Sequence, residues 1–370
     1  MTPMNTYRAA VVGCSRMGAF IDNEVRSSRS TVLPYSHAAG YETCPRTDLV
    51  AGADLREDVL ESFGQRYGVS AEHRYRDYRE LIRTERPDIL SIATQPEQRA
   101  EVARFAIEHG VRALYCEKPL CASVDEAHQL VAAVERHGVV VNMGTNRRWH
   151  PGFDAMRDLI VSGELGALKT LVVYSTGALF NTASHWFDAV IRLNGDAPVE
   201  WAQGHLPDGD SQLDGDEVIQ DPAAEGMFGF ANGVVAHALL SPRNNDIEAI
   251  CEWGTLTARG GGASFELHRL VTEDGERRHV AAPFPMFTRV STTLRLIEDL
   301  VQALDTGGPT RGGIGVAAAN IELLFACIES HRRGGQRVAL PLEGTTLRLA
   351  RRGAAPKQPK YDALPQRAPG

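Results

Sequence analysis

Short apolar runs that alternate with amphipathic stretches from Arg8 to Gly144 are the feature that most restricts the fold of this chain. The runs are rich in small and β-branched residues, which is typical of strands buried on both faces of a sheet. Five strands are expected, at Ala9 to Gly13, Leu49 to Asp54, Ile89 to Thr94, Ala113 to Cys116 and Val139 to Met143. The pattern predicts a parallel sheet whose strands are joined by crossover helices.

Helix start and stop signals support this prediction. Ser123 with Glu126 has the spacing of a capping box, and Gly138 stands where the following helix ends. A second helix is expected from Pro96, a residue suited to a first helical turn, to Gly110. Local signals and the apolar pattern therefore predict the same elements.

After Pro151 the pattern changes. A helix is expected from Phe153 to Ser162, followed by a mostly antiparallel sheet and two further helices. The expected strands are Leu168 to Ser175, Val199 to Gly204, Gly226 to Leu240 with a hairpin turn at Asn232-Gly233, and Ile247 to Ala258; the late helices are Thr292 to Leu304 and Val316 to Arg332. We predict an α/β Rossmann domain over residues 1–147, an α+β domain over 148–350 with a large open sheet, and a flexible tail over 351–370, which is rich in Pro, Arg and Ala.

Composition excludes several classes of protein. The chain has 370 residues, of which 23% are charged and 43% hydrophobic, which is the balance of a globular protein. Its formal net charge of -8 does not suit a nucleic-acid partner. The six scattered cysteines favour reduced thiols, and no apolar run predicts a membrane span or a signal peptide. We expect a cytoplasmic protein.

The run Gly13-Cys14-Ser15-Arg16-Met17-Gly18 follows the first strand and opens a helical pattern, as a dinucleotide fingerprint does. Gly13 would make the tight turn, and Gly18 would let helix and strand pack closely. Ser15 stands where the fingerprint has its middle glycine, and its hydroxyl can donate to a phosphate oxygen. We predict that Gly13, Ser15, Arg16, Met17 and Gly18 bind the cofactor.

Asp54, at the end of the second strand, is placed to accept from the ribose 2′-hydroxyl of NAD and to repel the 2′-phosphate of NADP. We therefore expect NAD, with NADP as the weaker alternative because Arg56 lies close by. The segment from Ala19 to Thr47 is longer than a usual first crossover. It predicts a surface loop plus a short helix, with a lid or an oligomer contact as the alternative.

The run Cys116-Glu117-Lys118-Pro119-Leu120 resembles the Glu-Lys-Pro motif of the Gfo/Idh/MocA oxidoreductases. The resemblance extends to about Val338. It includes the strand ending in Ala93-Thr94, the run from Asn146 to Pro151, the His185-Trp186-Phe187-Asp188 element and Arg337-Val338. It implies an NAD(P)-dependent dehydrogenase or reductase that acts on a secondary alcohol or ketone, with Thr94, Glu117 and Lys118 at the cofactor.

In this resemblance Lys118 is the catalytic lysine. Its ammonium, at the carboxyl end of a parallel strand, would hydrogen-bond the reacting oxygen. His185 is the candidate general acid/base, because a neutral imidazole can take the hydroxyl proton and return it in the reverse reaction. Relatives carry an aspartate four residues before this histidine, whereas this chain has Asn181. Asparagine cannot exchange a proton, although it can donate to a substrate hydroxyl.

The remaining predicted contacts stand near the second domain's start and on the His185 helix. Asn146, Arg148, Asn181 and Asp188 are expected to bind a polyol or keto-sugar substrate, with capping of its surroundings as the alternative role for Asp188. Trp149 is expected to be a core residue. Cys116, Cys121 and His128 lack a fourth ligand and a suitable geometry, so no metal is expected.

The primary hypothesis is an NAD-linked dehydrogenase of a sugar, cyclitol or glycoside. Ser15 and Asn181 motivate an alternative, a nucleotide-binding regulator without turnover, and NAD-dependent glycosidase chemistry by transient oxidation also fits the residues. The resemblance implies a homodimer or homotetramer formed through the open face of the C-terminal sheet.

Overall fold

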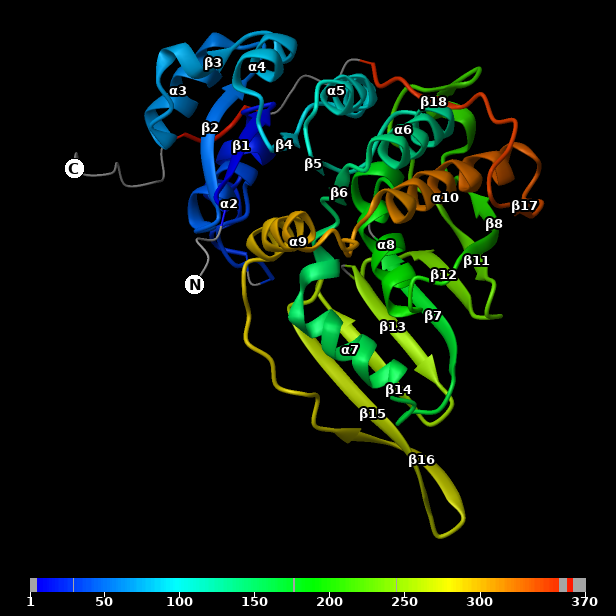
Figure 1. Cartoon of the computed structure of the whole chain (residues 1–370). Coiled ribbons are helices and arrows are strands. Elements are labelled where there is room, and N and C mark those ends of the chain that lie inside the picture. Colours follow the sequence, from blue (N-terminus) through cyan, green and yellow to red (C-terminus); the bar gives the residue numbers. More distant parts are fainter. Residues whose placement is uncertain (1–4, 29, 176, 244, 353–357, 362–370) are drawn as a thin grey trace. The chain divides into compact units, whose positions relative to one another are not determined.

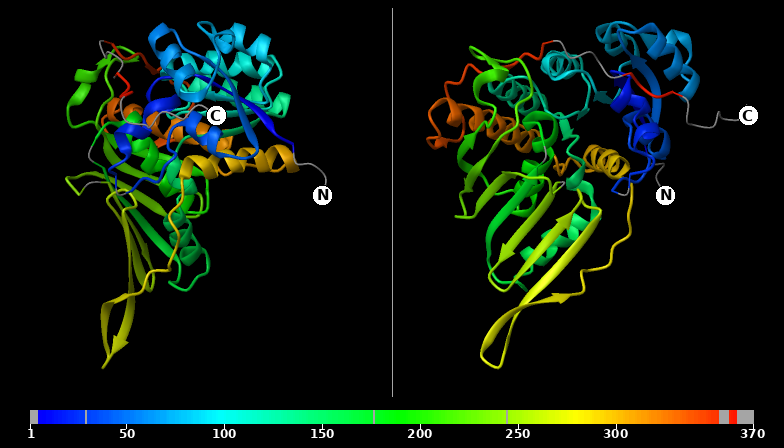
Figure 2. Two further views of the ribbon diagram at one scale, coloured as in Figure 1. Left: turned by 90° about the vertical axis from the view of Figure 1, so that its left-hand side faces the viewer. Right: turned by 180° about the vertical axis from the view of Figure 1, so that it is seen from behind.

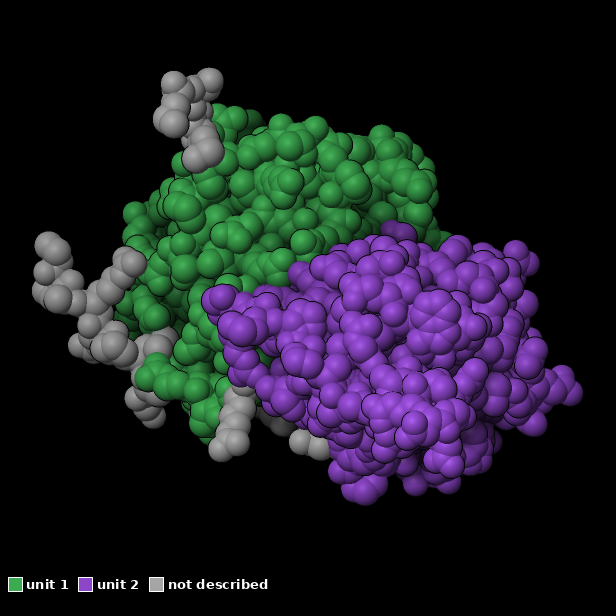
Figure 3. Space-filling view, turned by 90° about the horizontal axis from the view of Figure 1, so that it is seen from below, with its two compact units in different colours: residues 1–144, 290–314, 353–370 green, residues 145–289, 315–352 purple. Residues whose placement is uncertain are grey.

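The computed structural model describes residues 5–28, 30–175, 177–243, 245–352 and 358–361. The chain forms two compact units, coloured separately in Figure 3: unit 1 comprises residues 1–144, 290–314 and 353–370, and unit 2 comprises 145–289 and 315–352. The chain first passes from unit 1 to unit 2 between Gly144 and Thr145, three residues before the predicted domain boundary at 147/148. Residues 290–314, which the sequence had placed in the second domain, are part of unit 1 because their helix packs there.

Unit 1 is built on a six-stranded parallel sheet of order β3-β2-β1-β4-β5-β6, the strand order of a Rossmann fold (Figure 1). Its strands are β1 (Tyr7–Val12), β2 (Thr47–Ala53), β3 (Arg74–Tyr75), β4 (Ile89–Ile92), β5 (Ala113–Cys116) and β6 (Val140–Met143). Every residue of β4 and β5 is buried, which explains their unbroken apolar runs. The predicted fold class of this part is confirmed.

The helices of unit 1 are α1 (Asp22–Val25), α2 (His37–Thr43), α3 (Glu57–Tyr67), α4 (Tyr78–Glu85), α5 (Pro96–Glu108), α6 (Val124–His137) and α9 (Thr292–Thr306). The Ser123 side chain accepts from the Glu126 amide and Gly138 ends α6 in the left-handed conformation, as predicted. The Glu126 carboxylate accepts at 2.9 Å from the amide of Ala122. In the standard capping box this carboxylate accepts from the amide of the N-cap residue, Ser123, so the donor here is one residue earlier.

The segment from Ala19 to Thr47 differs from its prediction. Within it, α2 is the crossover helix between β1 and β2, and its residues from His37 to Tyr41 are buried. A Cβ added at Gly40 would lie 2.6 Å from Ile297 of α9, so the two helices are in close contact. The expected short helix is therefore present, but it is buried within unit 1 rather than placed at the surface.

Unit 2 contains a nine-stranded, mostly antiparallel sheet of order β16-β15-β14-β13-β7-β12-β11-β8-β17, in which only β7 and β12 pair in parallel among its described strands. The strands are β7 (Leu168–Ser175), β8 (Val199–His205), β11 (Glu225–Phe230), β12 (Val235–Leu240), β13 (Asp246–Cys251), β14 (Gly254–Arg259), β15 (Ser264–Glu273), β16 (Glu276–Ala282) and β17 (Val338–Ala339). The predicted open sheet is confirmed. The hairpin of β15 and β16 projects beyond the other strands (Figure 2).

Helices α7 (Pro151–Val161), α8 (Ser184–Leu193) and α10 (Ile314–Arg332) complete unit 2, with a small sheet of β9 (Leu213–Asp214), β10 (Glu217–Val218) and β18 (Arg348–Leu349). Among the described residues α10 is the one helix long and apolar enough to cross a bilayer, but 72% of its most apolar window is buried within the structure. This burial is typical of a core helix.

The predicted flexible tail lies only partly within the described residues. Arg352 forms ion pairs with Asp214 at 2.9 Å and with Glu217, and residues 358–361 pack against unit 1. The remainder, 353–357 and 362–370, lies outside the described part of the chain. The described tail residues therefore have defined partners.

Candidate functional site

The turn after β1 requires two glycines. Gly13 has a φ of +89°, and a Cβ there would lie 2.8 Å from the carbonyl carbon of Ala93. A Cβ at Gly18 would lie 1.9 Å from the carbonyl oxygen of Gly13. These contacts agree with the steric roles predicted for both glycines. Ser15 and Met17, both half-buried, lie between them, and Arg16 is paired with Glu24 at 2.6 Å.

Asp54 follows β2 at the same edge of the sheet and is half-buried. One carboxylate oxygen accepts from the amide of Arg56 at 3.1 Å. Burial raises the pKa of Asp54, and backbone hydrogen bonds from Arg56 and Cys14 partly oppose that rise. The Arg56 guanidinium is bound by Asp58, with an Nε to Oδ1 distance of 3.1 Å and a second contact from Nη2. Arg56, the basis of the NADP alternative, is therefore engaged by a neighbouring carboxylate.

The Glu117-Lys118-Pro119 turn follows β5, and Thr94 follows the adjacent strand β4. Because β1, β4 and β5 pair in parallel, Gly13, Thr94 and Lys118 lie at one edge of the sheet, the edge where ligands of such folds bind. Lys118 is half-buried, and its peptide bond to Pro119 is cis. The fold thus brings the predicted lysine to the predicted edge.

Arg99, which the sequence analysis missed, joins the two loops at this edge. Its side chain is buried, with 6% of its surface exposed. One guanidinium nitrogen donates to the carbonyl of Pro119 and another to the carbonyl of Thr94 at 2.6 Å. Arg99 therefore links the turn that carries Lys118 to the loop after β4.

Glu117 lies inside a buried polar cluster rather than at the surface. Its carboxylate contacts Nε2 of His37 at 3.1 Å, and Nδ1 of the same ring contacts the Ser91 hydroxyl at 2.9 Å. The imidazole stacks on the Tyr115 ring at 3.7 Å, and Tyr41 bonds Ser91 at 2.8 Å. Burial alone would raise the pKa of Glu117, but His37, Lys118 and Arg99 outweigh it and hold that pKa below its ordinary value.

In unit 2, His185 is the second residue of α8 and is half-buried. A π-helical turn, Leu179–Ala183, leads directly into this helix. Asn181 belongs to that turn and is exposed. Since side chains four residues apart lie on one helical face, Asn181 and His185 are expected to be neighbours on the surface of unit 2.

Asp221 caps this turn from a segment 40 residues away in sequence. Its two carboxylate oxygens accept from the amides of Phe180 and Asn181, each at 2.8 Å. Asp221 thus brings a carboxylate to the backbone of the turn that contains Asn181. No local pattern in the sequence could have identified Asp221.

Arg148 and Asp188 are the centre of a closed ion-pair network. The guanidinium contacts Asp188 at 2.7 Å and Asp196 at 2.7 Å, and the side chains of Arg148 and Asp188 are both 0% exposed. Burial raises the pKa of Asp188, and Arg148 only partly offsets that effect. Asn146 and Trp149 are also buried, as expected for Trp149. Arg148 and Asp188 therefore have no exposed surface through which to contact a substrate.

No metal site is found in the described part of the chain, since no three His, Cys, Asp or Glu side chains there are grouped to hold an ion. Cys116 and Cys121 are buried, and burial raises the pKa of Cys116 to about 12. His128 is exposed on α6. The two thiols are therefore protonated at neutral pH.

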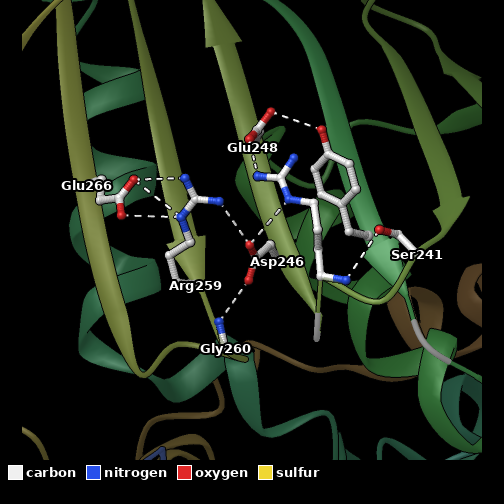
Figure 4. Close-up of polar contacts among 8 residues, drawn as sticks. Ser241, Asp246, Glu248, Arg259, Gly260 and Glu266 are labelled. Carbon is white, nitrogen blue, oxygen red and sulfur yellow. Dashed lines mark hydrogen bonds and ion pairs between the residues drawn. The ribbon is translucent and has the colours of Figure 1, made fainter.

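A second charged cluster covers strands β13, β14 and β15 of unit 2 (Figure 4). Arg259 contacts Asp246 and Glu266, each at 3.0 Å. Arg243 contacts Glu248 at 2.8 Å and lies over the Tyr174 ring, 3.9 Å from its centroid. These pairs give the sheet a polar, partly exposed face.

The sequence of unit 1 matches a family model. Residues 7–145 match the Gfo/Idh/MocA model, described as an oxidoreductase family with an NAD-binding Rossmann fold. The chain carries the NAD-binding domain of that family. The resemblance inferred from the Glu-Lys-Pro motif is confirmed.

Curated relatives are similar to this chain over part of its length. D-apiose dehydrogenase of Paraburkholderia graminis is 28% identical over 165 residues, covering 45% of this chain and 39% of the relative. Inositol 2-dehydrogenase of Salmonella typhimurium is 27% identical over 197 residues, covering 50% and 54%. An uncharacterized Bacillus subtilis oxidoreductase, YrbE, is 28% identical over 183 residues, covering 45% and 53%. The match spans about half the length of these relatives.

Solved structures extend the similarity of fold to both units. Levoglucosan dehydrogenase, in complex with NADH and L-sorbose, has a TM-score of 0.74 at 19% identity and covers 92% of this chain and 100% of its own. The aldose-aldose oxidoreductase of Caulobacter crescentus, complexed with glycerol, has a TM-score of 0.73 at 16% identity and covers 91% and 100%. At these identities the comparison establishes the fold alone.

Proposed function

We propose that this chain is an NAD-dependent dehydrogenase or reductase that acts on a secondary alcohol or ketone of a sugar, cyclitol or glycoside. The observation that supports it most is the Glu117-Lys118-Pro119 turn, held by His37 and Arg99 so that Lys118 stands at the ligand-binding edge of the sheet. A preorganised site requires that buried polar residues fix the reactive side chain, and His37 and Arg99 do this for the turn that carries half-buried Lys118.

The residues of unit 1 fit a dinucleotide. At Gly13 a side chain would collide with the backbone after β4, so the tight turn of a dinucleotide fingerprint can form here only with glycine. Asp54 presents a carboxylate to the ribose hydroxyls, and Arg56 is engaged by Asp58. Both features support NAD over NADP. When bound, the nicotinamide would supply the acceptor or donor of the hydride.

In this proposal Lys118 donates a hydrogen bond to the reacting oxygen and stabilises its developing negative charge in the alcohol oxidation. His185 removes the hydroxyl proton and returns it when the ketone is reduced. Asp221 fixes the turn before His185 through two amides, so it is a positioning residue. Asn181, exposed in that turn, is proposed to donate to a substrate hydroxyl.

Arg148 and Asp188, predicted to contact substrate, are proposed instead to support the start of unit 2 from within, because neither is exposed. Asn146, buried next to them, is assigned the same supporting role. The substrate class rests on the relatives, whose names specify D-apiose and inositol. A panel of aldoses, ketoses and cyclitols is therefore the appropriate screen.

The test compares the wild-type chain with Lys118→Ala and His185→Ala. Each variant is expected to retain NADH binding, followed by nicotinamide fluorescence, and to lose roughly 100-fold or more of the hydride transfer on the best substrate of the panel. Exchanging exposed Lys169 for Ala is the matched control. Wild-type turnover in both variants would refute the assignment, and NADH binding without turnover on the whole panel would favour the regulator.

We also propose that the chain is a homodimer or homotetramer in a reducing cytoplasm. Unit 2 exposes Leu239 on β12 and Trp253 in the turn between β13 and β14, which are 41% and 54% accessible. All six cysteines are free and buried. Light scattering of the wild-type chain and of Trp253→Asp would test the assembly, and a monomeric wild type would contradict it.

A further inference from the structure

A segment close to the end of the described chain, residues 358–361, packs beside the nucleotide-binding turn of unit 1. Pro359 is buried and Tyr361 is half-buried. The Tyr361 ring meets the Phe20 ring edge-on, with centroids 4.9 Å apart at 85°. The side-chain amide of Asn23 donates at 2.5 Å to the main-chain carbonyl of Lys360. Phe20 and Asn23 stand two and five residues after Gly18.

The charged residues between the end of β2 and the start of α3 also act on Tyr361. Burial raises the pKa of Tyr361, nearby Asp58 and Asp54 raise it further, and Arg56 opposes them. Asp54 is the carboxylate that a Rossmann fold directs at the adenosine ribose. Tyr361 is therefore near the ribose-recognition residues and also against the first turn of the fingerprint, although it is more than 300 residues away in sequence.

We propose that Tyr361 is a cofactor-binding residue that forms part of the adenosine end of the NAD site. This inference rests on the proposed function. Part of the ring is buried against Phe20, which fixes it, and part remains exposed, which leaves an aromatic surface for a ligand. Anchoring through Pro359 and through a main-chain carbonyl holds the segment whichever side chain stands at position 360.

A tyrosine in this position has a defined contribution. Its flat ring offers apolar contact to the adenosine. The contribution is confined to the adenosine half of the cofactor, because residues 358–361 contact Phe20 and Asn23, and the charges that act on Tyr361 are those of the Asp54 to Asp58 region. This restriction makes the proposal testable with fragments of the cofactor.

The experiment measures dissociation constants of NADH, ADP-ribose and reduced nicotinamide mononucleotide for the full chain and for four variants. Tyr361→Ala and a chain ending at Arg352 should each bind NADH and ADP-ribose roughly three- to tenfold more weakly, with the mononucleotide unchanged. Asn23→Ala, which removes the anchor, should give a smaller loss in the same direction. Lys360→Ala, whose side chain is exposed, is the matched control and should bind all three like the full chain.

Each other outcome has a definite meaning. Unchanged affinity for ADP-ribose in both Tyr361→Ala and the shortened chain would overturn the proposal. Tighter binding in either would overturn it as well, because the segment would then obstruct the site. A full chain that binds no NADH at all would instead refute the proposed function on which this inference rests.

Discussion

Glu117 of unit 1 and Asp188 of unit 2 are both buried carboxylates beside a basic residue of a sequence motif, yet their surroundings differ. Glu117 contacts the His37 ring and is followed by Lys118, which is half-buried. Asp188 contacts Arg148, and neither side chain is exposed. The pKa of Glu117 lies below its ordinary value because its cationic neighbours outweigh burial, whereas that of Asp188 is raised because burial dominates.

The comparison shows that a buried carboxylate can serve two purposes. In unit 1 it belongs to a scaffold that leaves a lysine accessible at the sheet edge. In unit 2 the carboxylate pairs with an arginine that is itself fully buried. The first arrangement is typical of a preorganised site and the second of a structural core, and the exposure of the basic partner separates the two.

The largest effect expected from this comparison concerns the closed network. Arg148→Met should lower the free energy of unfolding of unit 2 by about 3–5 kcal/mol, because Asp188 is left buried without its main partner. All four tryptophans, Trp149, Trp186, Trp201 and Trp253, belong to unit 2, so urea titration followed by tryptophan fluorescence measures this unit. Arg243→Met, which breaks exposed pairs, is the control and should cost about 1 kcal/mol or less. Equal losses of unfolding free energy in Arg148→Met and Arg243→Met would contradict the distinction between the buried and the more exposed ion pairs.

A smaller, catalytic effect is expected in unit 1. His37→Phe keeps a ring to stack on Tyr115 but removes the contacts with Glu117 and Ser91. It should lower kcat about tenfold, or about 1.4 kcal/mol, with the dissociation constant of NADH unchanged. His37→Gln, which can still donate to Glu117, should recover part of kcat. A parallel loss of NADH affinity, or no recovery with Gln, would mean that His37 supports only the fold.

The smallest expected effect is on the pH dependence of stability, which should change in opposite directions in variants of Glu117 and Asp188. The pKa of Glu117 is lowered in the folded chain, so its stabilisation is present above its ordinary pKa near 4.5 and is lost as pH falls through the folded value. The pKa of Asp188 is raised above 3.8, so its stabilisation is present at acid pH and is lost as pH rises. Between about pH 5 and pH 3, Glu117→Gln should therefore flatten the acid decline of stability and Asp188→Asn should steepen it. Urea midpoints from circular dichroism would measure both, and slopes of the same sign would contradict the comparison.

Sequence reasoning located the regular elements well because their signals are local. The bounds of β5 and β7 match the predicted runs, and Ser123 and Gly138 cap α6 where expected. It predicted a short helix between Ala19 and Thr47 but not the bounds or the burial of α2, because a short helix with small residues gives a weak periodic signal. Of the candidate site, Gly13, Gly18, Asp54, Thr94 and Lys118 reach one edge of the sheet in unit 1, whereas Arg148 and Asp188 turn inward.

The sequence by itself determined the alternation of strands and helices, the glycines of the first turn and the motif that places Lys118 after β5, because backbone conformation and side-chain periodicity depend on near neighbours. Only the tertiary structure decided which distant residues meet. His37 reaches Glu117 across 80 residues, Asp221 reaches Asn181 across 40, and Tyr361 reaches Phe20 from the far end of the chain. Such contacts follow from the order in which strands pair and helices pack, which no short stretch of sequence specifies.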